Sequence, residues 1–175
     1  MSRGSSNAFH EIERSITNAF RSADLNGSGK LGYHEFRRAI QAMKLMFHAE
    51  EVGHLLATHD LVGDGTISRE SFIEIFKPSY KEAALLSAFA SNKTDDDGFL
   101  GLKQLRLALI HLGLNLSEVE AYNLSRRCND ATGAFYKPVK VSFRSFCKLT
   151  SRACIYLHQA NIHPGGGIWP AGMSL

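Results

Sequence analysis

A twelve-residue segment, residues 24–35, carries oxygen-bearing side chains at its positions 1, 3, 5 and 12 and a glycine at position 6. Its candidate metal ligands are Asp24, Asn26, Ser28, Lys30 (through its main-chain carbonyl) and Glu35. A hard dication such as Ca²⁺ is bound by about six to eight oxygens, and a turn of this length presents them from alternate positions, with a bidentate glutamate at its end. Gly29 suits the bend at position 6 because it has no Cβ atom. The segment therefore predicts a Ca²⁺-binding loop.

Apolar residues flank this loop at helical spacing, and residues 9–44 are predicted to form a helix–loop–helix unit with both apolar faces turned toward one core. The flanking positions are Phe9, Ile12, Ile16 and Phe20 before the loop and Phe36, Ile40 and Met43 after it. The unit resembles the EF-hand superfamily. In that family the apolar residue at position 8, here Leu31, pairs with its counterpart in a second loop. Ser28 departs from the strict pattern, which has Asp or Asn at position 5, but its hydroxyl still supplies a neutral oxygen.

A second copy of the unit follows at residues 59–72, with a glycine at position 6 and Ile67 at position 8. Its loop keeps Asp60 and Asp64 at positions 1 and 5. Position 3 is occupied by Val62, and position 12 by Ser71, which offers one oxygen where the family has two. Glu70 lies one place too early, so weak binding through a shifted register stays open.

Two further copies are more degraded. In the third, residues 93–104, Lys93 places an ammonium group at position 1, and Gln104 has a single oxygen at position 12. The fourth is recognised by predicted helices at residues 119–127 and 143–149, and its loop is too long for the standard pattern. Neither loop is expected to bind Ca²⁺.

The resemblance to calmodulin and troponin C implies an all-α fold of two EF-hand lobes, each with two helix–loop–helix units and short paired β segments between the loops. The expected domains are residues 1–78, residues 79–160 and a Gly/Pro-rich tail, residues 161–175. The boundary falls at Pro78, because proline disfavours helix in the residue before it. Ser79 and Glu82 are predicted to form a capping box for the next helix, as are Ser117 and Glu120 for a later one. Apolar content of 44% suffices for two small cores.

Charge bears on the expected partner. The formal net charge is +3, with nine basic and ten acidic residues in residues 1–78 against eleven and seven in residues 79–175. A basic C-terminal half should repel the basic helices that calmodulin-like proteins grip and favour a neutral or acidic partner. Only Met43 and Met46 lie within the repeats, and filling of the core is the favoured role for both. We therefore expect a dedicated protein partner, a helix of a larger assembly.

Other classes of function find no support in the sequence. No basic run with interleaved aromatic residues points to nucleic acid, and no apolar segment points to membrane insertion. Three cysteines without Cys-x-x-Cys spacing, and no signal peptide, favour an intracellular location. His54 and His59 are expected to face apart on a helix, and no His/Cys cluster suggests zinc. No nucleophile or phosphate-loop motif suggests an enzyme.

Two functions remain. In the first, the protein is a Ca²⁺-binding regulatory or adaptor subunit with the ion at the first loop only, with an affinity of about 10⁻⁶ to 10⁻⁴ M because few carboxylates are present. In the second, it is a constitutive, largely calcium-independent subunit, resembling myosin light chains or cytoskeletal and ciliary EF-hand proteins. A cytoplasmic location, with the cytoskeleton or cilium as alternatives, is implied by that resemblance. Whether Trp169 in the tail anchors an interface, and the oligomeric state, stay open.

Overall fold

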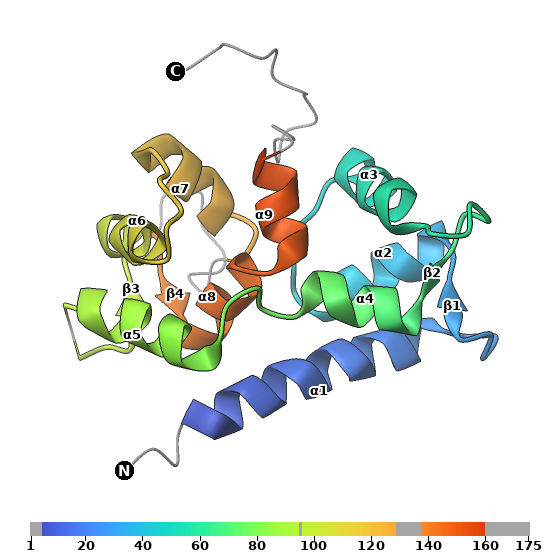
Figure 1. The fold of residues 1–175 in the computed structure, drawn as a ribbon, viewed down its shortest axis with the longest axis horizontal. Coiled ribbons are helices and arrows are strands. Elements are labelled where there is room, and N and C mark those ends of the chain that lie inside the picture. Colours follow the sequence, from blue (N-terminus) through green and yellow to red (C-terminus); the bar gives the residue numbers. More distant parts are fainter. Residues whose placement is uncertain (1–4, 95, 129–137, 160–175) are drawn as a thin grey trace.

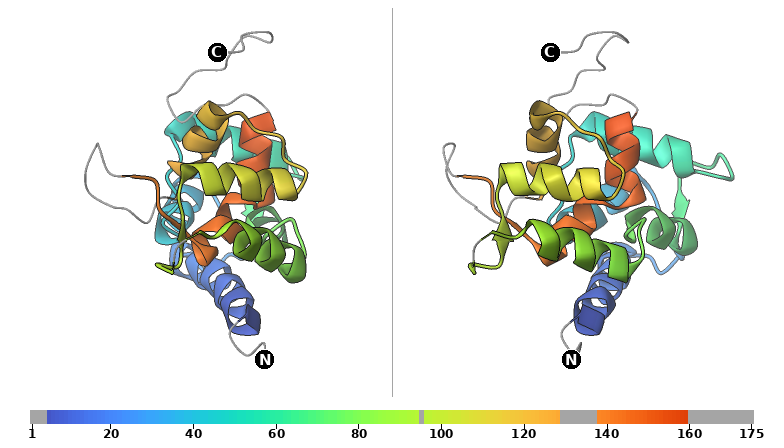
Figure 2. Two further views of the ribbon diagram at one scale, coloured as in Figure 1. Left: turned by 90° about the vertical axis from the view of Figure 1, so that its left-hand side faces the viewer. Right: turned by 60° about the vertical axis from the view of Figure 1, so that its left-hand side comes forward.

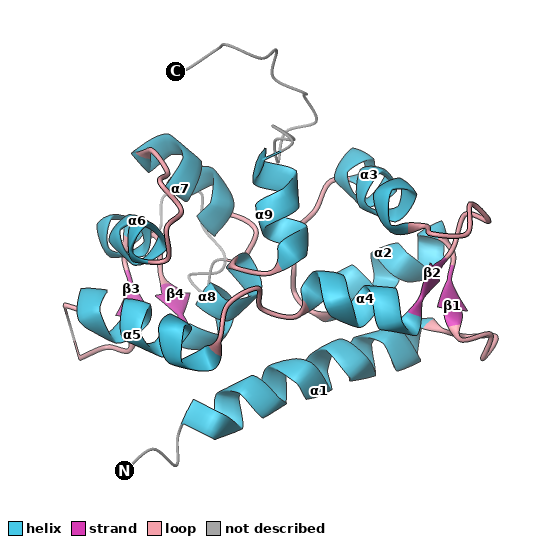
Figure 3. Cartoon of the chain, viewed as in Figure 1, coloured by secondary structure: helices cyan, strands magenta, loops and turns pink. Residues whose placement is uncertain are grey.

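A computed structural model describes residues 5–94, 96–128 and 138–159 of the chain. Its helices and strands alternate as helix–loop–strand–helix units (Figures 1 and 3). In chain order the elements are α1 (Ser5–Ala23), β1 (Lys30–Leu31), α2 (Tyr33–Ala42), α3 (Ala49–His59), β2 (Ile67–Ser68), α4 (Arg69–Phe76), α5 (Glu82–Asn92), β3 (Phe99–Leu100), α6 (Leu102–His111), α7 (Glu118–Ser125), β4 (Val141–Ser142), α8 (Phe143–Leu149) and α9 (Arg152–Gln159). The fold is all-α with short strand pairs between loops, as the sequence predicts.

The short strands pair in the manner expected of EF-hand loops. Strand β1 is antiparallel to β2, with Leu31 opposite Ile67, and β3 is antiparallel to β4, with Leu100 opposite Val141. All four side chains are fully buried. The pairing of position-8 residues is confirmed, and it places the first and second loops side by side at one end of the molecule and the β3–β4 pair at the other (Figure 3).

Among the described elements helix α1 is the longest. It connects the two halves of the fold, which are the first half, up to residue 78, and the second half, from residue 79 onward. Its apolar stripe is buried through Ile12, Ile16 and Phe20, because these residues recur on one face of the helix. Helix α1 contacts α2 and α4 of the first half and also α5 and α8 of the second. Figure 1 shows it running beneath both halves, and Figure 2 shows the same arrangement from the side.

The buried apolar side chains form one continuous cluster that includes residues of both halves. Five phenylalanines of the first half make ring contacts with one another: Phe20, Phe36, Phe47, Phe72 and Phe76. In the second half Phe89 contacts both Phe143 and Phe146. The apolar side chains of the two halves therefore meet in one cluster, because the helices of the two halves pack directly on each other. The division at residues 1–78 and 79–160 stays a prediction, and the tail, residues 161–175, lies outside the described residues.

The segment between the halves is hydrogen-bonded to the second half. Pro78 forms an isolated antiparallel bridge with Ser151, and the Ser79 amide donates to the Thr150 carbonyl at 3.1 Å. The predicted helix over residues 143–149 is confirmed as α8, and α9 follows it as a separate helix. The two helices are separated at Thr150 and Ser151, the residues whose backbone pairs with Ser79 and Pro78.

The two predicted capping boxes have different outcomes. Ser117 accepts from the Glu120 amide at 3.2 Å, and Glu120 accepts from the Ser117 amide at 2.7 Å, so this box is confirmed. The box of Ser79 and Glu82 is wrong, because the N-cap of α5 is Lys81, without a side-chain capping bond, and Glu82 is the first helical residue. The backbone of Ser79 is used by the pairing with α8 instead.

A buried ion pair ties the halves together away from the loops. The Arg127 guanidinium donates to Glu51 Oε1 at 2.6 Å, and their side chains are only 3% and 0% exposed. Glu51 lies in the first turn of α3, and its other oxygen accepts from the His48 amide at 2.8 Å. Arg127 follows α7 and stacks over the Phe47 ring at 5.0 Å. The pair fixes the start of α3 against the end of α7.

Candidate calcium loops

Loop 1, residues 24–35, brings its predicted ligands to one turn between α1 and α2. The Asp24 carboxylate accepts from the Ser28 amide at 3.0 Å and from the Gly29 amide at 2.9 Å. Asn26 Oδ1 accepts from the same Ser28 amide at 3.0 Å, and the Ser28 hydroxyl donates to the Lys30 carbonyl at 2.9 Å. The oxygens at positions 1, 3, 5 and 7 thus share hydrogen-bond partners inside one turn.

Glu35 closes this loop from the first turn of α2. One of its oxygens accepts from the Leu25 amide at 3.3 Å, and the other accepts from the Gly32 amide at 3.1 Å. The first contact spans ten residues and brings position 12 back over position 2. The carboxylate of Glu35 therefore lies beside the backbone of Leu25, the residue that follows Asp24.

The donor set fits Ca²⁺ better than a softer metal. It holds carboxylate, amide, hydroxyl and carbonyl oxygens, and no nitrogen or sulfur ligand. Among the described residues no three His, Cys, Asp or Glu side chains gather into a metal-holding group. An ion in loop 1 would thus depend on the neutral oxygens of Asn26, Ser28 and Lys30 beside two carboxylates. Asp24 and Glu35 also accept hydrogen bonds from the loop backbone.

The glycine at position 6 behaves alike in three loops. Gly29, Gly65 and Gly98 have φ angles of 75°, 77° and 83°. These values lie in the left-handed region of backbone conformation, which residues with a Cβ atom rarely adopt. In loops 1 and 2 the amide of this glycine donates to the aspartate at position 1, at 2.9 Å and 2.7 Å. Loop 2 therefore keeps the shape of loop 1 even where its ligands have changed.

Loop 2 departs from loop 1 in what its acidic residues contact. Asp60 accepts bonds from several loop amides, and the Gly65 amide contributes most to holding its pKa below the usual value. The ammonium group of Lys30, from loop 1, donates to Asp64 Oδ2 at 2.8 Å. With the Thr66 hydroxyl, it lowers the pKa of Asp64 to about 2. Ser71, at position 12, donates its amide to Ser68.

Loop 3 shows a similar cross-loop contact. Asp97 Oδ1 accepts from the Phe99 amide at 3.0 Å. Its Oδ2 lies 3.3 Å from the ammonium of Lys140 in loop 4, the segment between α7 and β4. The Phe99 bond and the lysine both hold the pKa of Asp97 below its usual value. Gln104, at position 12, donates to the Thr94 hydroxyl at 3.3 Å. Most of loop 4 lies outside the described residues.

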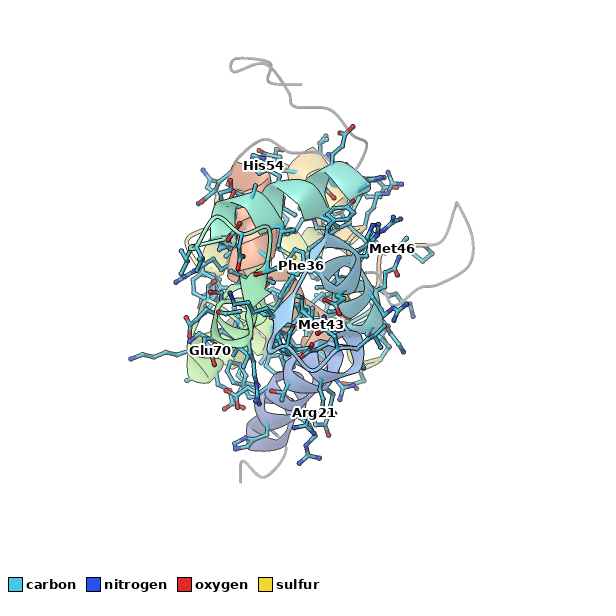
Figure 4. All side chains as sticks on the ribbon, turned by 90° about the vertical axis from the view of Figure 1, so that its right-hand side faces the viewer. Arg21, Phe36, Met43, Met46, His54 and Glu70 are labelled. Carbon is cyan, nitrogen blue, oxygen red and sulfur yellow. The ribbon has the colours of Figure 1, made fainter. Side chains whose placement is uncertain are left out.

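Two expectations about single residues are wrong. Met43 is buried, but the side chain of Met46 is 69% exposed, so filling of the core applies only to Met43 (Figure 4). His54 and His59 do not face apart. Both rings contact Tyr156 of α9, with centroids 5.7 Å and 5.9 Å away, and His54 Nε2 lies 2.8 Å from the tyrosine hydroxyl. Helix α9 packs against α3, and its Tyr156 ring contacts both histidine rings.

Comparison with known proteins matches loops 1 and 2 to a family and finds relatives of the chain. Residues 13–77 match the family described as an EF-hand domain pair. Human centrin-3 is 29% identical over 114 residues, which cover 63% of this chain and 68% of centrin-3. Calmodulin-like protein 2 from Arabidopsis thaliana is 25% identical over 103 residues, which cover 57% of this chain and 68% of that protein. A solved structure of a homolog of programmed cell death 6 protein from Leishmania major covers 77% of this chain and 69% of its own, with 22% identity and a TM-score of 0.38.

The chain therefore contains an EF-hand domain pair that spans loops 1 and 2. Its sequence is also similar to calmodulin-like proteins and centrins, at 25–29% identity over 57–63% of its length. Within its described residues, no helix is both long and apolar enough to cross a membrane.

Proposed function

We propose that the protein binds one Ca²⁺, at loop 1, and acts as a regulatory or adaptor subunit of a partner protein. The observation that carries the ion proposal is the convergence of the five predicted ligands: Asp24, Asn26, Ser28, the carbonyl of Lys30, and Glu35. Glu35 supports it most, because it is the one glutamate at position 12 of the described loops, and it already reaches across its loop. Two ligand carboxylates imply an affinity of about 10⁻⁶ to 10⁻⁴ M.

Calorimetric titration with Ca²⁺ tests this assignment with two matched variants. Glu35→Gln keeps the size of the side chain and removes the charge and one oxygen of the closing ligand, and we expect binding to weaken at least about tenfold, or about 1.4 kcal/mol. Glu70→Gln makes the same change one place before position 12 of loop 2, at an exposed residue (Figure 4), and should leave binding unchanged. A larger loss in Glu70→Gln would move the site to loop 2 in the shifted register.

An apolar dye added to the same titration separates a regulator from a constitutive subunit. A regulator should expose apolar surface when Ca²⁺ binds, and Glu35→Gln should lose that signal. The constitutive alternative has support in loops 2 and 3, where lysines contact the acidic residues and the closing glutamate is missing. Binding without dye fluorescence would favour that alternative, with Ca²⁺ as a structural ion.

A protein partner is supported by apolar side chains on the outer surface of the second half. The packed helices α6 and α7 expose Leu107, Ile110, Val119 and Tyr122. The excess of basic residues in this half favours a neutral or acidic amphipathic helix. Titration with helical peptides of equal apolar content and differing charge tests this, and preferential binding of basic peptides would contradict it. A cytoplasmic location, at the cytoskeleton or cilium, is proposed from the likeness to centrins. We propose no catalytic activity.

A further inference from the structure

One exposed ion pair connects the two loops in each half of the molecule, and the loop positions are the same in both. Lys30 Nζ lies 2.8 Å from Asp64 Oδ2, and Lys140 Nζ lies 3.3 Å from Asp97 Oδ2. Lys30 is at position 7 of loop 1, directly before Leu31 of the strand pair, and Lys140 lies directly before Val141, which pairs with Leu100 at position 8 of loop 3. Each aspartate is at position 5 of the facing loop. The antiparallel pairing of the strands creates both contacts.

The two carboxylate oxygens of each aspartate also have corresponding partners in the two halves. Oδ1 of Asp64 accepts from the Thr66 amide at 3.0 Å, and Oδ1 of Asp97 accepts from the Phe99 amide at 3.0 Å, two residues further along in each case. Oδ2 faces the lysine of the other loop. Position 5 is a ligand position in a Ca²⁺ loop, so the ammonium group lies on an oxygen that a metal ion would otherwise share.

Loop 1 differs from loops 2 and 3 in this respect. The residue at position 7 of loop 2 is Thr66, which has no charge to offer, and position 5 of loop 1 is Ser28, which has no carboxylate to receive one. The two loops that contact a lysine have each lost the glutamate at position 12 and one further ligand. The lysines are therefore found where the ligand set for an ion is incomplete.

We propose that Lys30 and Lys140 act as tethered cations that replace a metal ion in the facing loops, loop 2 and loop 3, and exclude Ca²⁺ from them. The inference rests on the proposed function, because it gives the reason that Ca²⁺ is confined to loop 1. The ammonium group neutralises the carboxylate at position 5 and adds a link beside the strand pair, so each degenerate loop keeps its shape without an ion. A divalent ion entering loop 2 would have to displace Lys30 from Asp64 and would meet its charge at close range.

The test is a Ca²⁺ titration of Lys30→Met, followed by the NMR amide signals of Gly29 for loop 1 and Gly65 for loop 2. We expect Gly65 to show an added binding step, with a dissociation constant of about 10⁻⁴ to 10⁻³ M. That step should be absent from the unmodified protein, from the charge-retaining Lys30→Arg, and from Lys77→Met. The last variant removes a lysine from another exposed pair, with Glu74, that lies outside the loops.

Three results would overturn the proposal. They are no added step at Gly65 in Lys30→Met, the same step in the unmodified protein, or the same step in Lys77→Met. Lys140→Met, followed at Gly98, repeats the test in the second half should Lys30→Met fold poorly. The proposed function fails separately, when Gly29 of the unmodified protein shows no step that Glu35→Gln removes.

Discussion

The buried pair of Glu51 and Arg127 yields the most demanding prediction. In Glu51→Ala the guanidinium of Arg127 keeps its buried place over the Phe47 ring but loses the carboxylate 2.6 Å away. The His48 amide at the start of α3 also loses its acceptor. Breaking one side of a buried ion pair costs about 3–5 kcal/mol, because the remaining charge stays out of water without the opposite charge of that carboxylate.

Urea unfolding followed by circular dichroism measures this loss. With an m-value of about 2 kcal/mol/M, the unfolding midpoint of Glu51→Ala should fall by about 1.5–2.5 M. Glu74→Ala, which breaks the exposed pair with Lys77, serves as the control and should change the free energy of unfolding by no more than about 1 kcal/mol.

The double variant Glu51→Met/Arg127→Met distinguishes the loss of one charge of the buried pair from the loss of both. With both charges replaced by apolar side chains, the desolvation cost of the guanidinium is removed together with the carboxylate that offset it, so this variant should be more stable than Glu51→Ala. Two results would refute the reasoning. One is a loss below about 1 kcal/mol in Glu51→Ala, and the other is a double variant less stable than Glu51→Ala.

Two further predictions concern titrating groups. The pKa of Asp64 is depressed to about 2 in the folded protein, so stabilisation by its contact with Lys30 is present above the unfolded value near pH 4 and is lost as the pH falls toward 2; a carboxyl NMR titration with a midpoint near 4 would contradict this. Burial raises the pKa of Cys147 to about 12 and that of Cys154 to about 11. Both thiols should therefore resist a thiol reagent at pH 8 in the native protein and react in denaturant, whereas rapid native labelling of either would show that the core opens there.

The loops were predictable because their chemistry is local. The candidate ligands at positions 1, 3, 5, 7 and 12 and the glycine at position 6 lie within twelve residues, and a single turn brings them together. The partner of Leu31 could be named as well, because the repeat places Ile67 at the same position of the second loop. The capping box at Ser117 was predictable for the same reason, since its two members are three residues apart.

Ser79 shows where local reasoning fails. Its spacing from Glu82 satisfies the capping pattern, but its backbone pairs with Thr150 instead, about seventy residues further along the chain. The prediction for Met46 failed because this residue lies in the connection between α2 and α3, where exposure depends on how the two helices pack. The prediction that His54 and His59 face apart failed for a related reason. Both contact Tyr156, and the sequence of α3 does not show from which direction α9 packs against it.

By itself, then, the sequence determined the helix–loop–helix units, the one loop with a complete set of ligands, and the strand pairs that join the loops. Only the tertiary structure decided that the two halves share one core, that Glu51 is buried against Arg127, and that Lys30 and Lys140 reach aspartates of the facing loops. Short-range patterns are fixed by the geometry of a turn or a helix. Contacts between distant segments depend on how whole helices pack, and many residues contribute to that packing together.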